Sequence, residues 1–185
     1  MPFPSKTDRQ TILATAMDQV SKDGINKLAI RSVAATLGLA PNALYRYFAN
    51  LAALQAALAD ESRCRLHQAL HKAAGKKPPL EAIRSIAKAY VRFAQEQPQV
   101  FSLTLLPSTT ETEGEAVHVL MWRFVLEHVA AIYGEERAPE AAVALWAFLH
   151  GIATLKAAGI FGERKPVNSF EFGVRMWIKA SEDLD

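Results

Sequence analysis

The stretch that most constrains the fold is residues 30–49, IRSVAATLGLAPNALYRYFA. Val33 and Leu37 recur at the spacing of one helix face. Gly38 then ends that helix, because glycine adopts a left-handed backbone without steric cost. Pro41 begins a second helix at its first turn, where a missing N–H costs nothing. Two short helices joined by a tight turn containing glycine predict a helix-turn-helix, the unit that lays its second helix in a DNA major groove.

The same stretch predicts which of its residues pack together. Leu39 is expected to be a buried plug, and the small Ala34 allows the two helices to approach each other. Leu44, Tyr47 and Phe48 give the second helix one apolar face. A plain helical bundle can also carry a glycine between two amphipathic helices, so this pattern alone leaves that alternative open.

The polar residues of the second helix favour DNA as the partner. Asn42, Tyr45 and Arg46 lie away from the apolar face and are expected to be exposed. An amide, a phenol and a guanidinium are the groups that meet base edges and phosphates. The DNA contacts are expected among ten residues, with the first two peripheral: Lys6, Arg9, Arg31, Ser32, Pro41, Asn42, Ala43, Tyr45, Arg46 and Tyr47.

The N-terminal part of the chain resembles the TetR family of one-component regulators. The resemblance implies an all-helical dimer that represses until a small molecule enters its C-terminal domain, with Tyr45 and Tyr47 mainly touching phosphates. Further along, Trp146, His150 and Gly151 resemble the Trp…His-Gly signature of one ligand-domain subgroup. The N-terminal resemblance rests on Ile12-Leu13, Ala16, Gly24, Val33-Ala34, Leu37-Gly38-Leu39, Leu44-Tyr45 and Phe48.

Two positions depart from that family's pattern. Leu51 stands where the family usually has a lysine at the start of the next helix. Ala40 stands where it often has Ser or Thr, whose hydroxyl would cap the second helix and bind a phosphate. Both departures are expected to weaken anchoring to the DNA backbone and to increase the reliance on Arg46.

The distribution of charge agrees with a polyanion partner for the N-terminal part only. The net charge of the 185-residue chain is +2, yet residues 1–50 hold six basic and three acidic side chains. A basic N-terminal module therefore precedes a nearly neutral body. The single cysteine, Cys64, excludes an intramolecular disulfide, and no apolar run opens the chain as a signal peptide. We therefore expect a cytoplasmic protein.

Hydrophobic periodicity predicts an all-α fold of about nine helices. The expected division is a helix-turn-helix DNA-binding domain over residues 1–49 and a ligand-binding and dimerisation domain over residues 50–185. Ser5 and Asp8 have the spacing of a capping box before the first helix. Beyond the head, helices are expected over residues 51–74, 80–97, 115–133 and 139–158 and from residue 168 or 169, with a short apolar segment at 100–106.

Enzyme, metal and membrane functions find little support in the sequence. No phosphate loop, His-Glu-x-x-His pair or nucleophile elbow is present, so neither an enzyme nor a cofactor is expected. Cys64, His67 and His71 share a helix face, but Cys64 and His71 are separated by about 10.5 Å of helix rise, too far for one ion to bind all three. No metal site is expected. Residues 141–161 are apolar over a membrane-spanning length, but the polar residues within them favour a buried helix and no membrane partner.

The aromatic residues of the body include candidates for a ligand site. Trp146 and His150 share a helix face with Ala153 and Ala157, and bulky and polar rings beside small residues can line a cavity for an apolar or aromatic effector. A core histidine at His150 is an equally good interpretation. The candidate ligand-binding residues are Tyr90, Phe93, Phe101, Trp122, Trp146 and His150.

The last two helices predict a homodimer. The helix at 139–158 is apolar on most of its circumference, so one neighbour cannot cover it. In the last helix, Phe172 and Met176 lie opposite the stripe that contains Trp177. The sequence therefore favours a dimeric, ligand-responsive regulator of operator DNA, a repressor by the resemblance. The alternatives are a helical module whose head binds protein, and an apolar-ligand binding protein with a degenerate head.

Overall fold

The computed structural model describes residues 7–107, 117–162 and 168–182, and within them every regular element is a helix, as predicted. Two compact units share the chain: residues 1–64 with 97–114, and residues 65–96 with 115–185. The first unit contains α1 (Arg9–Asp23), η1 (Ile25–Lys27), α2 (Ile30–Thr36), α3 (Pro41–Leu44), α6 (Pro98–Ser102), η2 (Leu103–Leu105) and the start of α4 (Leu51–Ala74). The second contains the rest of α4, α5 (Pro79–Glu96), α7 (Val117–Tyr133), α8 (Ala138–Ala157) and α9 (Ser169–Glu182).

The first helix begins where a carboxylate can cap it. The side chain of Asp8 accepts a hydrogen bond from the Thr11 backbone N–H at 2.7 Å, which satisfies one of the free amides of the first turn. That bond also lowers the pKa of the Asp8 carboxyl. Asp8 is itself the N-cap, so the predicted capping box from Ser5 to Asp8 was wrong; Ser5 lies outside the described residues. The buried face of α1 consists of Ile12, Ala16, Met17 and Val20.

The turn between α2 and α3 has the geometry that its glycine predicts. Gly38 has a φ of 65°, in the left-handed region. The backbone N–H of Leu39 donates to the Ala34 carbonyl at 2.9 Å and that of Gly38 to the Ala35 carbonyl at 3.1 Å, the pair of bonds of a Schellman motif. Leu39 is only half-buried, so the prediction that its side chain is a buried plug was wrong. The backbone hydrogen bonds, rather than a buried side chain at Leu39, hold this turn.

The second helix of the motif, α3, is shorter than its apolar pattern suggests. Regular α-helix covers Pro41–Leu44, and a turn follows in which the N–H of Phe48 donates to the Leu44 carbonyl at 3.0 Å. Ala40 at the N-cap has no side chain to accept from the first turn, and no side-chain cap bond forms. Leu44 and Phe48 are buried nevertheless, so tertiary packing fixes this helix.

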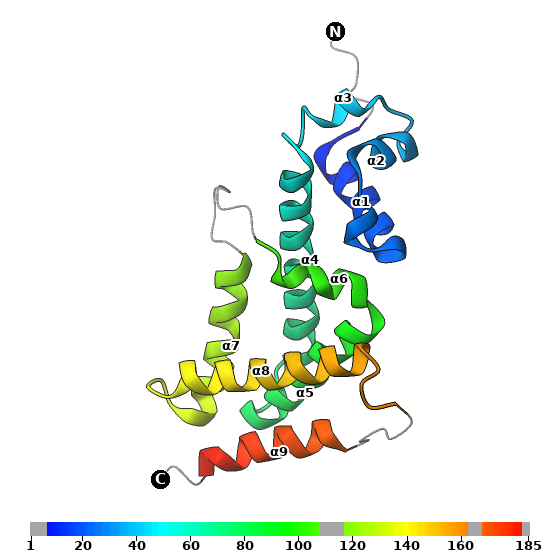
Figure 1. Cartoon of the computed structure of the whole chain (residues 1–185). Coiled ribbons are helices and arrows are strands. Elements are labelled where there is room, and N and C mark those ends of the chain that lie inside the picture. Colours follow the sequence, from blue (N-terminus) through cyan, green and yellow to red (C-terminus); the bar gives the residue numbers. More distant parts are fainter. Residues whose placement is uncertain (1–6, 108–116, 163–167, 183–185) are drawn as a thin grey trace. The chain divides into compact units, whose positions relative to one another are not determined.

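A segment from beyond α5 completes the first unit. α6 packs against α1, and Figure 1 shows its short helix, in green, beside α4. Gly24, with a φ of 81°, ends α1 close to Gln99, whose Oε1 would lie 3.0 Å from an added Cβ. Val100, Phe101 and Leu103 are buried. The predicted short apolar segment is therefore a core element of the N-terminal unit.

The second unit is a set of amphipathic helices packed on α8. α8 packs on α5, α7 and α9, and Figure 1 shows α9 running beside it. α8 and α9 pack closely at Gly173 of α9, where an added Cβ would lie 2.1 Å from the Phe148 ring of α8. A side chain at residue 173 would displace that ring, so this glycine allows α8 and α9 to approach each other.

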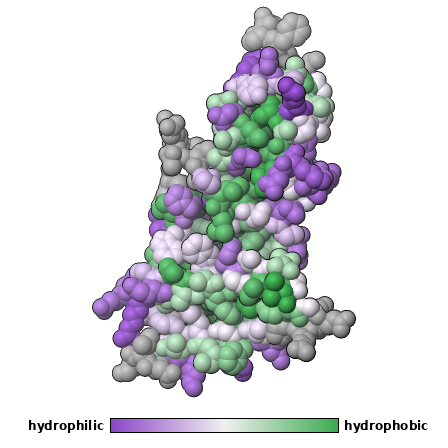
Figure 2. Space-filling view, in the orientation of Figure 1, coloured by the Kyte–Doolittle hydropathy of each residue, from purple (hydrophilic) through white to green (hydrophobic). Residues whose placement is uncertain are grey.

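Apolar side chains also remain exposed on the last two helices. Figure 2 shows them gathered over α8 and α9 on the viewed face. The largest are Val143, Trp146 and Leu155 on α8 and Phe172 and Met176 on α9, each between 42% and 57% exposed. By length and composition α8 would also pass as a membrane span. That test is weak evidence, because core helices of soluble proteins pass it too.

Candidate nucleic-acid interface

The exposed side of α3 and of the turn that follows it presents three polar side chains. Asn42, Tyr45 and Arg46 are all exposed, Tyr45 to 50%, while Leu44 between them is fully buried. Arg31 at the start of α2 is exposed as well. The helix is therefore anchored on one side and presents an amide, a phenol and a guanidinium on the other, in agreement with the sequence pattern. These groups can donate to phosphates and read base edges.

Ser32 belongs to a hydrogen-bond network that joins α2 to α1. Its hydroxyl lies 2.9 Å from Gln19 Oε1 and 2.8 Å from the Ala29 carbonyl oxygen. The Gln19 amide donates to the Thr36 hydroxyl at 2.9 Å. The sequence patterns did not single out Gln19 or Thr36. The network fixes α2 against α1, which positions the turn that leads into α3.

The start of α1 is joined to the end of the motif by two aromatic residues. The Tyr47 hydroxyl donates to the Thr7 carbonyl at 2.8 Å. The Arg9 guanidinium lies over the Phe48 ring, 4.7 Å from its centroid, as in a cation–π contact. Arg9 and Tyr47, two of the ten predicted DNA contacts, therefore also hold the head together. Of the other predicted contacts, Pro41 and Ala43 are half-buried on α3, and Lys6 lies outside the described residues.

In the second unit, three of the six predicted ligand residues meet through hydrogen bonds. Trp146 Nε1–H donates to the Tyr90 hydroxyl oxygen at 3.1 Å, and that oxygen lies 3.0 Å from His150 Nδ1. Burial raises the pKa of Tyr90 to about 12, although the Trp146 bond opposes this shift. Burial lowers the pKa of His150. The neutral imidazole of His150 can therefore accept a hydrogen bond from the Tyr90 hydroxyl at Nδ1. Trp146, Tyr90 and His150 thus form a chain of hydrogen bonds between α5 and α8.

The other three predicted ligand residues lie on three different helices. Phe93 is buried on α5, one helical turn from Tyr90. Trp122 on α7 is 37% exposed. Phe101 is buried on α6, which belongs to the first unit. A separate open groove of about 610 Å³ lies elsewhere in the second unit, lined by the paired rings of Tyr133 and Trp177 and by Glu136, Arg137, Glu140, Ala141, Ala144 and Ala180.

The histidines of α4 pack around a phenylalanine. The ring centroids of His67 and His71 lie 5.4 and 5.5 Å from that of Phe124 on α7. The ring of His128, also on α7, lies 4.4 Å from the same centroid in a tilted arrangement. Burial, followed by the nearby His71, lowers the pKa of His67. In the part of the chain that the structure describes, no three His, Cys, Asp or Glu side chains are grouped to hold a metal ion.

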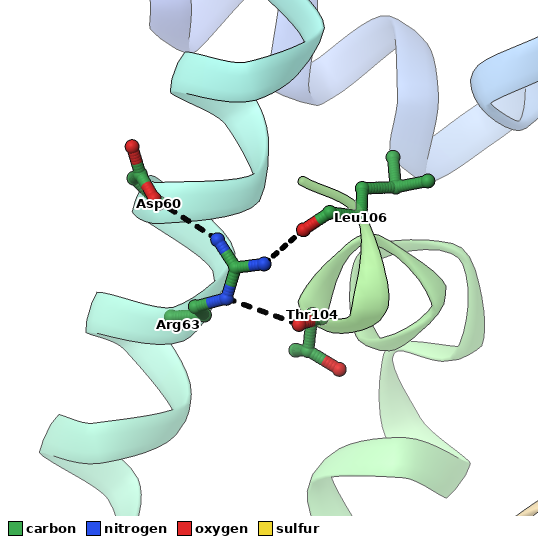
Figure 3. A network of polar contacts seen from close by, with 4 residues as sticks. All are labelled: Asp60, Arg63, Thr104 and Leu106. Atoms are coloured by element: carbon green, nitrogen blue, oxygen red, sulfur yellow. Dashed lines mark hydrogen bonds and ion pairs between the residues drawn. The ribbon is translucent and has the colours of Figure 1, made fainter. Parts of the chain in front are cut away.

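Two buried polar residues of α4 were missed by the sequence patterns. Ser62 and Arg63 lie in the first unit, and Figure 3 shows Arg63 reaching from α4 to the backbone that follows α6. A signal was available for Ser62, because it occupies the middle of a four-residue repeat of leucines formed by Leu54, Leu58, Leu66 and Leu70. One polar residue on such a buried face requires an internal hydrogen-bond partner.

Comparison with known proteins gives the family. The model described as "Bacterial regulatory proteins, tetR family" matches residues 12–58. The model described as "Tetracyclin repressor-like, C-terminal domain" matches residues 83–177, more than half of the chain.

The chain belongs to the TetR family.

This TetR-family protein is a transcriptional regulator whose helix-turn-helix is the family's DNA-binding motif. It is 25% identical over 174 residues to YobS of Bacillus subtilis, described as an uncharacterized HTH-type transcriptional regulator, and the match covers 92% of this chain and 90% of YobS. A Rhodococcus sp. RHA1 protein of unknown function has the same fold, with a TM-score of 0.79, 25% identity and coverage of 97% and 98%. A variant of TetR from Acinetobacter baumannii AYE, solved in complex with minocycline, superposes with a TM-score of 0.70 at 19% identity, over 96% and 98% of the two chains.

Proposed function

We propose that this TetR-family regulator is a repressor that binds operator DNA through α3 and is released by a small-molecule effector. The observation that carries the proposal is the exposed set Asn42, Tyr45 and Arg46 on α3 and the turn after it, whose other side is fixed by the buried Leu44 and Phe48. Residues 1–49 provide the DNA contacts and residues 50–185 dimerise and sense the effector. A cytoplasmic location follows from DNA as the partner.

Gel shifts with duplexes selected from a random pool test the DNA contact directly. Arg46→Ala is expected to weaken binding by roughly 1–3 kcal/mol and to relax the preference at one base position, because a guanidinium that meets a base edge contributes about that much. A uniform loss across sequences would mean that Arg46 binds phosphate. Arg92→Ala removes an exposed charge of α5 and is the matched control. Unchanged affinity in Arg46→Ala would contradict the assignment and favour a head that binds protein.

The polar chain of Tyr90, Trp146 and His150 supports a ligand site between α5 and α8. An indole that is 46% exposed and held in place by its N–H offers a fixed aromatic face to an apolar or aromatic effector. The minocycline complex of the TetR variant supports a small-molecule effector for this fold. Regulation, rather than catalysis, is the activity we assign to the chain.

The exposed apolar residues of α8 and α9 support a homodimer through these helices. Side chains such as Val143, Phe172 and Met176 form more apolar surface than the neighbours within one chain cover. A twofold axis through α8 and α9 would bury the same patch on both subunits. Dimerisation also gives two heads, which is what a palindromic operator requires.

A further inference from the structure

Two buried polar side chains fasten α4 to the segment that follows α5. Within the first unit, the Ser62 hydroxyl donates to the Val100 carbonyl at 2.6 Å. Arg63 Nε donates to the Thr104 carbonyl at 3.0 Å, and its Nη2 donates to the Leu106 carbonyl. Figure 3 shows the two Arg63 bonds leaving one guanidinium, whose Nη1 also lies 2.9 Å from Asp60 on the same helix.

The guanidinium is matched to the carbonyls that it meets. Arg63 is 7% exposed, and burying a cation is costly unless it is paired and hydrogen-bonded. Thr104 lies in η2 and Leu106 directly follows it, where a helix end leaves carbonyl groups without partners. Arg63 donates hydrogen bonds to these carbonyl groups, and the Asp60 carboxylate balances its charge. Removing the guanidinium would leave the carbonyls unpaired and the segment free to shift along α4.

The α6–η2 segment that Arg63 holds also supports the helices of the DNA-binding head. α6 packs against α1, and Gln99 lies against the backbone where α1 ends at Gly24. α1 in turn holds α2 through Gln19 and Ser32. The head is thus supported twice, once by the chain that enters α4 and once by the α6–η2 segment that Arg63 fixes to α4.

We infer that Arg63 is a positioning residue for DNA recognition: it joins the head, the first half of α4 and the α6–η2 segment into one rigid DNA-reading unit. The inference rests on the proposed operator binding and goes beyond it, since Arg63 touches no DNA. A rigid unit fixes the direction in which each head meets the operator. In a dimer, that direction determines which distance between half-sites is accepted.

Operator selection with Arg63→Met tests this assignment, because methionine keeps much of the apolar stem and removes every donor. Arg92→Met, which removes an exposed charge from α5, is the matched control. Both variants and the wild type are given the same random duplex pool. Affinities are then measured for the wild-type operator and for versions whose half-sites are moved one or two base pairs apart or together.

The variant is expected to bind the wild-type operator about tenfold more weakly, because DNA binding must then also order the loosened head. It is also expected to accept the shifted operators almost as well, whereas the control keeps the wild-type preference. A role in stability alone would lower the melting temperature and leave the preferred spacing unchanged. Unchanged spacing preference in a folded Arg63→Met would therefore overturn the inference. If the wild type selected no duplex, the proposed function would fail instead.

Ser62→Ala provides the second variant. It removes the other bond from α4 to α6 and leaves the guanidinium in place, so the protein is expected to fold even where Arg63→Met does not. A smaller relaxation of spacing in the same direction supports the rigid unit. Wild-type spacing in Ser62→Ala, when Arg63→Met does not fold, would contradict it.

Discussion

Two side chains of the head that are predicted to contact DNA also stabilise the fold of the head. The Arg9 guanidinium packs over Phe48, and the Tyr47 hydroxyl binds the Thr7 carbonyl, so two of the predicted phosphate contacts also close the three-helix head. Within the part of the chain that the structure describes, Asn42, Tyr45 and Arg46 carry no such bond, and all three are exposed. Asn42 and Arg46 are therefore the strongest candidates for sequence recognition. Arg9, Tyr45 and Tyr47 are the candidates for anchoring to the DNA backbone.

Leu51→Lys is expected to strengthen duplex binding. Leu51 is the first residue of α4 and is half-buried, at the position where the family usually has a lysine. One added phosphate contact should steepen the slope of log affinity against log salt by about one unit. Titrations at several salt concentrations measure this slope. Gln68→Lys adds the same charge at an exposed site further along α4, and an equal gain in both variants would show a general charge effect.

Acid is expected to destabilise the packing of α4 on α7. The pKa of His67 is lowered by burial and by His71, so the unfolded chain binds a proton more readily than the folded one. This histidine therefore lowers the free energy of unfolding as pH falls below its ordinary pKa, near 6.5, and has no effect well above it. Urea unfolding at pH 7.5 and pH 5.5 should show a smaller loss in His67→Asn than in the wild type. The exposed His118→Asn is the control, and an identical loss in all three proteins would exclude the mechanism.

At the scale of elements, glycines decide how closely the helices approach. Gly38 provides the left-handed turn of the helix-turn-helix, and Gly173 makes room for the Phe148 ring between α8 and α9. The first was predictable from its place between two apolar patterns. The second was not, because the sequence of α9 does not show which residue of α8 it meets.

Gly173→Ala is expected to destabilise the second unit. Its Cβ would lie 2.1 Å from the Phe148 ring, and overpacking of this kind costs roughly 1–3 kcal/mol of unfolding free energy. Gly151→Ala is the matched control, because nothing lies within 4 Å of its added Cβ. It should instead stabilise α8 by up to about 1 kcal/mol through helix propensity. Unfolding curves at one protein concentration compare the two variants, and equal stabilities would contradict the packing argument.

The sequence predicted the helices well and their long-range partners poorly. Periodicity and the glycine and proline punctuation placed α5, α8 and α9 within a residue or two, because those signals are local. Arg63 escaped notice because a lone charged residue on a helix is usually solvated, and its carbonyl partners lie more than 40 residues away. Tyr90 and His150 were predicted near one site, but their hydrogen bond depends on how α5 and α8 pack. The roles assigned to the individual site residues stay predictions.

At the scale of the whole molecule, the two compact units do not follow the order of the chain. α4 contributes residues to both units, and the α6–η2 segment returns to the first unit after α5 has formed part of the second. A regulator built in this way cannot be cut after residue 49 without exposing the faces that α4 and α6 cover.

Phe172→Glu is expected to weaken the proposed dimer. Phe172 is 57% exposed on α9, and an unpaired carboxylate buried in an apolar interface costs several kcal/mol, which corresponds to roughly two orders of magnitude in the dimer dissociation constant. Analytical ultracentrifugation over a range of concentrations measures it. Val119→Glu, at an exposed apolar site of α7, should leave the dimer intact. A wild-type dissociation constant in Phe172→Glu would place the interface elsewhere.

Operator recognition by two α3 helices in a dimer is tested most directly by sequencing the duplexes that the full-length protein retains from a random pool at physiological salt. Enrichment of one palindromic sequence is expected, with half-sites about one helical turn apart or a little more and a preference that changes at one base position in Arg46→Ala. Retention of duplexes without any enriched sequence, or of none at all, would contradict sequence-specific regulation by this chain.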